Sequence, residues 1–341
     1  MKQRETRDRI RLKEFLFNSD NKIITIAGLS KNAGKTSFLN YLIQSYPKPN
    51  NLAVTTTGHD GEDFDFLTGL SKPKIKLKAG NYFTCLSETL KKHRMSVKVI
   101  KRLNIDVLSK PLYLAQAVHD VETEIFGGAH KLEQIQLCKE IQLLGIEYIM
   151  IDGSLDRKGV ALSPDISSIV IVASPVAKDI DSLKDELNRL VQLSTIKLYQ
   201  LNNIDDEKFY YALNNELIKT NIHSFFKNEN EILTILKQNP TLLYIPSAIT
   251  DNVMKRFKDI FTQYTGKIII KHPLHLMCTS NHFDILLKKD LYCLNNFPLT
   301  AIALNSYSVE NNHIYANRLM EIIQESFSEI PIIDVQSLVF D

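Results

Sequence analysis

The residues with the clearest chemical meaning lie in one short stretch that ends in Gly-Lys-Thr-Ser. In a loop of this type, backbone N–H groups surround phosphate oxygens, the lysine contacts the β and γ phosphates, and the threonine hydroxyl binds Mg²⁺. The stretch therefore predicts a nucleotide-binding loop. Its candidate binding residues are Gly28, Ser30, Lys31, Asn32, Ala33, Gly34, Lys35, Thr36 and Ser37.

The flanking residues are of the kind that such a loop requires. An apolar strand begins after Lys22, and an apolar helix continues to about Ile43, so the order is strand, loop, helix. One detail departs from the common spacing, because five residues separate Gly28 from Gly34 where four are usual. Either Leu29 takes the place of the first glycine, or the loop is one residue longer. A chance glycine turn is the structural alternative.

A cluster of acids follows the next predicted strand, Asn51 to Thr57. Four carboxylates lie between Asp60 and Asp65. Open α/β sheets bind ligands beyond the carboxyl ends of their strands, and crowded negative charges favour a nearby cation. We therefore predict that Asp60 has a catalytic or Mg²⁺-binding role through water, or that the segment senses the γ phosphate. An ordinary acidic turn is the alternative.

A second acid, Asp152, ends the buried-looking strand from Glu147 to Gly153. A strand-terminal Asp beside a phosphate-binding loop orients the Mg²⁺ ion or its water in many nucleotide-binding proteins. We predict that Asp152 shares one Mg²⁺ with Thr36 and that Lys35, Asp152 and Asp60 are the catalytic residues. An Asp that only terminates a strand is the competing interpretation.

The remaining pattern alternates strands and helices. Ile166–Ala173 and Ile196–Leu201 are predicted strands with a helix from about 180 to 193 between them, which indicates a doubly wound, mostly parallel α/β sheet of the P-loop NTPase type. Asn202, at the end of the later strand, is a candidate for contacting the nucleotide base, although turns also favour asparagine.

Two further regions are expected beside this sheet. Lys74–Leu77 and Tyr82–Leu86 alternate in polarity around a turn, which predicts an inserted hairpin. Beyond residue 205 we predict helices at 207–218, 229–237 and 247–263, with short strands near 242, 267–270, 298–304 and 330–334. The predicted domains are 1–205, with an N-terminal helix, and a smaller C-terminal α/β region, 206–341. The last strand-helix-strand unit either extends the first sheet or makes its own.

Two charged or ligand-rich segments have ordinary structural explanations. The first 20 residues predict a solvated helix that leans on the domain, with a basic docking arm as the alternative. His272, His275, Cys278 and His282 have spacings that suggest a metal site, but Pro273 indicates an irregular segment, and local packing is the preferred explanation.

Composition excludes several classes. The 341 residues include 41 basic and 39 acidic side chains, so no strong net field attracts nucleic acid or a membrane surface. The four cysteines have no paired spacing, and no apolar run reaches the length of a signal core or a membrane span. We expect a reduced, cytoplasmic protein without a nucleic-acid or membrane partner.

Three motifs together carry a resemblance. Gly-Leu-Ser-Lys-Asn-Ala-Gly-Lys-Thr, Thr-Gly-His-Asp-Gly-Glu-Asp-Phe-Asp and Ile-Asp-Gly-Ser-Leu-Asp-Arg are similar to those of the small P-loop subunit of lysine 5,6-aminomutase reactivase, the KamB-like proteins. The resemblance covers most of the chain, but His59, Ser154 and residues 88–125 depart from it. It implies an ATP- and Mg²⁺-dependent ATPase that acts with a MutS-like ATPase subunit. The implied client is an adenosylcobalamin-dependent aminomutase whose inactivated cofactor is exchanged.

Two other functions remain open from the sequence. The loop also resembles that of dethiobiotin synthetase and related ATP-dependent ligases, which activate a carboxylate of a small molecule. A nucleotide-binding scaffold that never turns over is the third possibility. Binding without hydrolysis distinguishes the scaffold, and substrate-dependent ADP release without a protein partner distinguishes the ligase.

Overall fold

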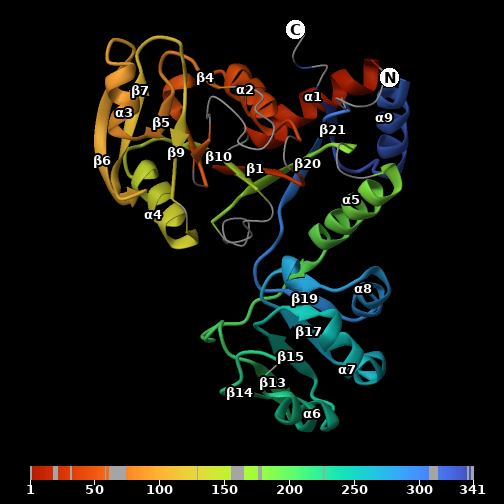
Figure 1. Ribbon diagram of the computed structural model, residues 1–341. Coiled ribbons are helices and arrows are strands. Elements are labelled where there is room, and N and C mark those ends of the chain that lie inside the picture. The colour runs from red at the N-terminus through yellow and green to blue at the C-terminus, as the bar shows by residue number, and fades with distance from the viewer. Residues whose placement is uncertain are drawn as a thin grey trace. The chain divides into compact units, whose positions relative to one another are not determined.

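The computed structural model describes residues 2–17, 22–30, 33–57, 59–60, 74–128, 130–154, 165–175, 179–225, 227–306, 314–335 and 338. The chain forms two compact units (Figure 1), one made of Met1–Asn188 and Pro298–Asp341 and the other of Arg189–Phe297. The second unit is therefore inserted into the sequence of the first. Among the described helices, none is both long and apolar enough to cross a membrane.

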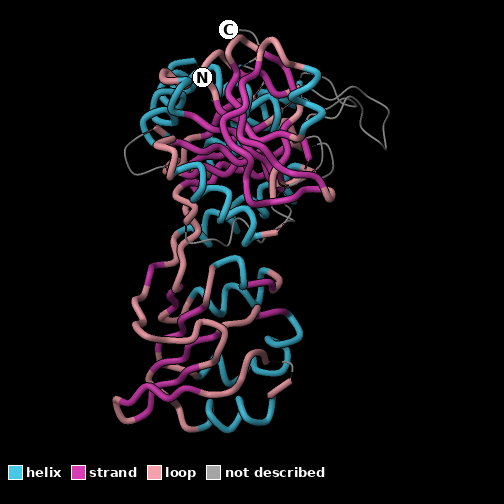
Figure 2. The backbone as a smooth tube through the Cα atoms, turned by 90° about the vertical axis from the view of Figure 1, so that its left-hand side faces the viewer, coloured by secondary structure: helices cyan, strands magenta, loops and turns pink. Residues whose placement is uncertain are grey.

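The first unit contains a nine-stranded, mostly parallel sheet, visible as the twisted strands in Figure 2. The strand order is β21-β20-β11-β1-β10-β2-β5-β7-β6, and only the pairs β5·β7 and β6·β7 are antiparallel. The strands are β1 (Ile23–Gly28), β2 (Leu52–Thr56), β5 (Tyr82–Cys85), β6 (Val97–Val107), β7 (Lys110–Ala117), β10 (Tyr148–Ser154), β11 (Ser168–Ala173), β20 (Leu299–Leu304) and β21 (Ile332–Asp334).

Helices cover both faces of this sheet, which explains its continuous apolar strands. Every residue of β1 and of β11 is buried, as expected for strands packed on two sides. In Figure 1, α1 (Lys2–Leu16) and α2 (Lys35–Ser45) lie above the sheet, and α4 (Lys131–Gln142) and α5 (Ile180–Ser194) lie below it. The mixed α/β class with a large, mostly parallel sheet is thus confirmed.

The smaller elements of the first unit surround the sheet. They are β3 (His59–Asp60), β4 (Ile75–Leu77), β8 (Val121–Thr123), β9 (Ile125–Phe126), α3 (Ser87–Lys92) and α9 (Ile314–Ser326). In the N-terminal helix α1, Leu12 and Leu16 are fully buried, whereas Ile10 and Phe15 are exposed. This helix packs on the first unit, as expected for a solvated helix that leans on the domain.

The predicted hairpin between residues 74 and 86 is wrong. β4 pairs with β8, whereas β5 pairs with β2 and β7, so the two strands do not pair with each other. The reason is tertiary: Asn40 of α2 hydrogen-bonds the backbone of Lys74 and of Lys76, each at 2.8 Å. The hairpin of this region is β6–β7, whose turn residues Leu108 and Ser109 have positive φ.

The second unit has its own six-stranded sheet in the order β12-β19-β17-β15-β13-β14. Its first four strands are parallel, and β13 and β14 are antiparallel additions at one edge. The elements are β12 (Lys197–Leu198), β13 (Tyr210–Leu213), β14 (Glu216–Lys219), α6 (Glu229–Lys237), β15 (Leu242–Ile245), β16 (Ile249–Thr250), α7 (Asp251–Gln263), β17 (Lys267–Ile270), β18 (Leu276–Met277), α8 (Ser280–Leu287) and β19 (Leu291–Cys293).

Two predicted elements of this unit differ from the structure. The predicted helix at 207–218 is the hairpin β13–β14, because Asn214 and Asn215 adopt positive φ and form its turn. The predicted strand Ile196–Leu201 is reduced to the two residues of β12, and it belongs to the second sheet.

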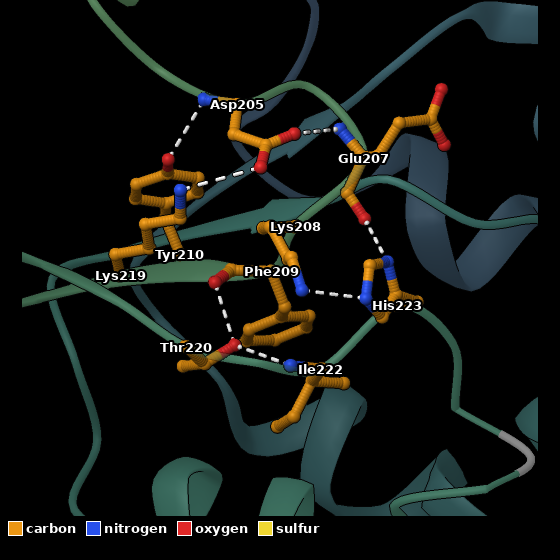
Figure 3. A network of polar contacts seen from close by, with 9 residues as sticks. All are labelled: Asp205, Glu207, Lys208, Phe209, Tyr210, Lys219, Thr220, Ile222 and His223. Carbon is orange, nitrogen blue, oxygen red and sulfur yellow. Dashed lines mark hydrogen bonds and ion pairs between the residues drawn. The ribbon is translucent and has the colours of Figure 1, made fainter.

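The region around the predicted boundary at residue 205 is an ordered turn within the second unit (Figure 3). Asp205 accepts a hydrogen bond from the backbone N–H of Glu207 at 3.2 Å and contacts Lys219 at 3.3 Å, while its own N–H donates to the Tyr210 hydroxyl at 2.8 Å. The chain then returns to the first sheet at Pro298. The observed units therefore differ from a division into 1–205 and 206–341, and β20–α9–β21 extends the first sheet.

Candidate functional site

The candidate site begins where β1 ends. The N–H of Leu29 still donates to the carbonyl of Val172 on β11, at 3.0 Å, so the ladder of the sheet extends one residue beyond Gly28. Four residues, 30 to 33, then remain before Gly34. This geometry agrees with the interpretation in which Leu29 takes the first glycine position of a loop of common length.

Gly28 and Lys35 are in close contact across the loop. A Cβ atom on Gly28 would lie 2.8 Å from Cδ and 3.1 Å from Nζ of Lys35. The absence of a Cβ at Gly28 lets the lysine side chain lie along the strand end, and a larger residue there would displace it. The ammonium group therefore lies beside the end of β1, next to the loop in which a phosphate chain would need a positive charge.

The N-terminus of α2 is available to an anion. Gly34 precedes the helix with φ of 97°, and no side chain caps the helix start. The first turn, Lys35 to Ser37, contains no acidic residue, so the partial positive charge of the helix is not neutralised there. The buried Oγ of Ser30 also has no hydrogen-bond partner among the described residues. Such donors suit phosphate oxygens.

Asp152 lies on the neighbouring strand, on the face that α2 covers. β10 pairs with β1 in parallel, with Asp152 opposite Ile26, and the side chain of Ile26 belongs to the apolar cluster under α2. Because side chains alternate along a strand, Asp152 shares that face with Met150 of the same cluster. The residue has no exposed surface, so its carboxylate is held in a low-dielectric environment where a cation has strong effects.

The backbone around Asp152 is fixed by β2. Its carbonyl oxygen accepts from Thr56 Oγ1 at 3.1 Å and from the N–H of Thr57 at 2.9 Å. Gly127 packs directly on this corner, since a Cβ there would lie 1.8 Å from the carbonyl oxygen of Thr56. The backbone of Asp152 is therefore held by β2, and Gly127 packs against the same part of β2.

The other predicted site residues are only partly placed. The backbone of Asp60 lies in β3, which pairs with β9 opposite Ile125, but its side chain lies outside the described residues. Lys31, Asn32 and residues 61–65 also lie outside them. Asn202 belongs to the second unit, so it is not part of the group that the first unit brings together.

The structure adds one residue that the sequence did not indicate. Asn305 follows β20, and its side-chain nitrogen would lie 3.1 Å from a Cβ on Gly34. The backbone N–H of Asn305 donates to the carbonyl of Ala173 at 2.7 Å, which fixes it beside β11. The sequence does show an Asn directly after an apolar strand, which could have marked it as a candidate. Its contact with Gly34, however, depends on the order of the strands in the sheet.

The histidine and cysteine segment of the second unit does not gather into a metal site. Among the described side chains, no group of three or more His, Cys, Asp or Glu could hold a metal ion. His282 contacts Asp251 at 2.7 Å, and His272 accepts a hydrogen bond from the N–H of Leu274 at 3.1 Å. Burial raises the pKa of the Cys278 thiol, which disfavours the thiolate that metals bind.

Comparison of the chain with protein-family models, with curated proteins and with solved structures gave no match. The candidate site must therefore be interpreted from its own geometry.

Proposed function

We propose that the first unit binds Mg²⁺ and ATP in the loop between β1 and α2 and is a P-loop ATPase. The observation that carries the proposal is the convergence of three features: Lys35 held against Gly28, the uncapped start of α2, and buried Asp152 on the adjacent strand. Backbone N–H groups and Lys35 would hold the phosphates, and Thr36 and Asp152 would hold Mg²⁺ or its water. The metal would neutralise charge that develops on the phosphates.

The binding part is tested by the substitution Lys35→Ala. Loss of the ammonium group should weaken ATP binding at least about tenfold, equal to about 1.4 kcal/mol. Isothermal titration calorimetry measures this, with circular dichroism to confirm the fold. Lys48→Ala is a matched control, because Lys48 is an exposed lysine just beyond α2. Equal ATP affinity of the two variants would overturn the assignment of the loop.

A particular role follows from the resemblance of the three motifs. We propose that the chain is the ATP-binding subunit of a reactivating factor that restores an adenosylcobalamin-dependent aminomutase by ATP-dependent exchange of damaged cofactor. The candidate nucleotide site supports this role, and so does the pairing of β3 with β9, which connects Asp60 to the body of the first unit. The acidic segment that follows would respond to the γ phosphate and alter a partner surface.

The test uses a complete reaction mixture. An adenosylcobalamin-dependent aminomutase is inactivated by turnover and then receives this protein, a MutS-like ATPase subunit, ATP, Mg²⁺ and fresh cofactor. Activity should return only with all components, and it should not return with Lys35→Ala. ATP hydrolysis by the chain alone should be slow and should increase when the partner is added.

Two outcomes would contradict this role. Recovery of aminomutase activity in a mixture that lacks this protein would show that the protein is not required for reactivation. Rapid ATP turnover by the chain alone, dependent on a small carboxylate, would favour the ligase instead.

A further inference from the structure

The second unit contains a cavity that the proposed ATP site does not use. It has a volume of about 540 Å³, within the range of roughly 300 to 1,000 Å³ that is typical of small-molecule sites. It lies where the chain leaves the carboxyl end of β15 and enters α7, which is a usual place for ligands in α/β sheets. Figure 1 shows β15, α6 and α7 in this part of the second unit.

The inner wall of the cavity is apolar. Phe225 and Phe257 line it, and both are at least nine-tenths buried. Their rings lie 5.2 Å apart at an angle of 73°, so they support each other in an edge-to-face arrangement. Ala248 and Val253 add aliphatic surface. This wall fits an aromatic or branched apolar group.

The rim of the cavity is polar and carries one unpaired positive charge. Glu229 and Arg256 form an ion pair across α6 and α7, so their charges offset each other. Lys255 also lines the cavity and has no ion-pair partner among the described residues. The hydroxyl groups of Ser224, Ser247 and Thr250 likewise have no hydrogen-bond partner in the described part of the chain.

The start of α7 adds little to the preference for negative charge. Thr250 precedes the helix without capping it through its side chain. The acidic group in the first turn, Asp251, accepts hydrogen bonds from Thr279 and His282 and is thus engaged with α8. The carboxylate of Asp251 still offsets the partial positive charge of the helix start, so Lys255 is the group that favours an anion in the cavity.

These features select one class of ligand. We propose that the cavity binds a small molecule with an aromatic or branched apolar body and a single anionic group. A nucleoside triphosphate does not fit, because one unpaired lysine offsets a single negative charge and the inner wall offers no polar partner for phosphates. A metal ion does not fit, because among the described residues Glu229 is the only carboxylate that lines the cavity.

The experiment uses the full chain and two matched fluorescent probes. 1-Anilinonaphthalene-8-sulfonate carries one sulfonate on an aromatic body, and N-phenyl-1-naphthylamine has the same body without the charge. Titration should show one saturable site per chain for the sulfonate, with weaker binding of the neutral probe. The variant Lys35→Ala, which changes the proposed ATP site, should bind both probes as the original chain does. This result would separate the cavity of the second unit from the proposed ATP site.

Three variants locate the site. Val253→Trp fills the cavity and should weaken sulfonate binding at least about tenfold, whereas Lys258→Trp, on an exposed position of the same helix, should leave it unchanged. Lys255→Gln should weaken the sulfonate about threefold, as expected for a partly screened charge, and should leave the neutral probe unchanged.

The inference is overturned if the sulfonate does not bind, if Val253→Trp and Lys258→Trp act alike, or if the neutral probe binds as tightly as the sulfonate. Near-ultraviolet circular dichroism of each variant separates loss of the cavity from loss of the fold.

Discussion

The two units each contain a strand-to-helix connection beyond a parallel strand, and the two connections are packed in opposite ways. At β1–α2, side chains approach the glycines closely: a Cβ on Gly28 would lie 2.8 Å from Cδ of Lys35, and a Cβ on Gly34 would lie 3.1 Å from the side-chain nitrogen of Asn305. At β15–α7, the surrounding segments leave a cavity of about 540 Å³. The first connection is closely filled by the side chains of Lys35 and Asn305, whereas the second leaves space between its side chains.

This difference is consistent with the different ligands that we propose for the two sites. A phosphate chain is held by N–H groups, a lysine and a metal ion, which requires a close backbone and therefore glycine. An apolar ligand is held by contact with side chains, which requires space between them. The same position in an α/β sheet thus provides either type of site, according to how closely the neighbouring segments approach.

The largest expected effect tests the close packing of the first unit at Gly127, which lies against β2. Gly127→Ala places a Cβ 1.8 Å from the carbonyl oxygen of Thr56 and 2.7 Å from Thr55 Oγ1. The backbone must shift, so the free energy of unfolding should fall by about 3 kcal/mol. Val253→Ile adds one methyl group beside the cavity and should change it by less than about 0.5 kcal/mol. Urea denaturation measures both variants.

A similar loss in the two variants would show that the cavity is closed in solution. A small loss for Gly127→Ala would show that the contact of Gly127 with β2 is not maintained. Either result would break the comparison between the closely packed first unit and the open cavity of the second unit.

The second prediction concerns the chemistry of the closely packed connection. Under the proposed function, Asp152→Asn removes a charge that holds Mg²⁺ or its water. Mg²⁺-dependent ATP hydrolysis should fall about tenfold or more, while nucleotide binding without Mg²⁺ should stay within about twofold. Steady-state hydrolysis and calorimetry in EDTA separate the two effects.

The control is Asp106→Asn, which changes an exposed carboxylate on β6 and should alter neither quantity. Equal loss of hydrolysis and of Mg²⁺-free binding in Asp152→Asn would mean that Asp152 acts through the fold rather than through the metal.

The parts of the site that the sequence predicted are local. β1, α2 and β10 are continuous apolar segments that end in recognisable residues, so the positions of Lys35 and Asp152 at strand and helix ends followed from the pattern. The strands β11, β15, β17, β20 and β21 were predicted for the same reason. The sequence pattern that predicts each of these strands is contained in the strand itself and the few residues beside it.

The parts that could not be predicted depend on contacts between distant segments. The pairing of β4 depends on Asn40 of α2, which hydrogen-bonds the backbone of Lys74 and Lys76. The alternation of polar and apolar residues along β4 contains no information about that contact. Asn305 reaches Gly34 only because β20 lies beside β11. The cavity in the second unit likewise requires residues near 225, 248 and 256 to meet. The hairpin β13–β14 had a local signal, the pair Asn214–Asn215, that favours a turn.

The smallest expected effect concerns how α7, beside the open connection, is held. Asp251 Oδ1 accepts from His282 Nδ1 at 2.7 Å and from the N–H and hydroxyl of Thr279 at 2.8 and 2.9 Å. These bonds, that from His282 foremost, lower the pKa of Asp251 from 3.8 to about 2. Because the folded pKa lies below the unfolded one, the carboxylate stabilises the fold above about pH 4, and this contribution disappears as the pH falls towards 2.

Asp251→Asn should therefore lower the free energy of unfolding at pH 6. The difference from the original chain should shrink between pH 4 and pH 2, the range between the unfolded and the folded pKa of Asp251. Urea denaturation across this range measures the difference. Asp259→Asn, at an exposed position of the same helix, should show no such change. Sulfonate binding at neutral pH should persist in Asp251→Asn, because the carboxylate is turned to α8. A difference that stays constant with pH would mean that Asp251 does not ionise differently in the folded chain, and that packing alone holds α7 against α8.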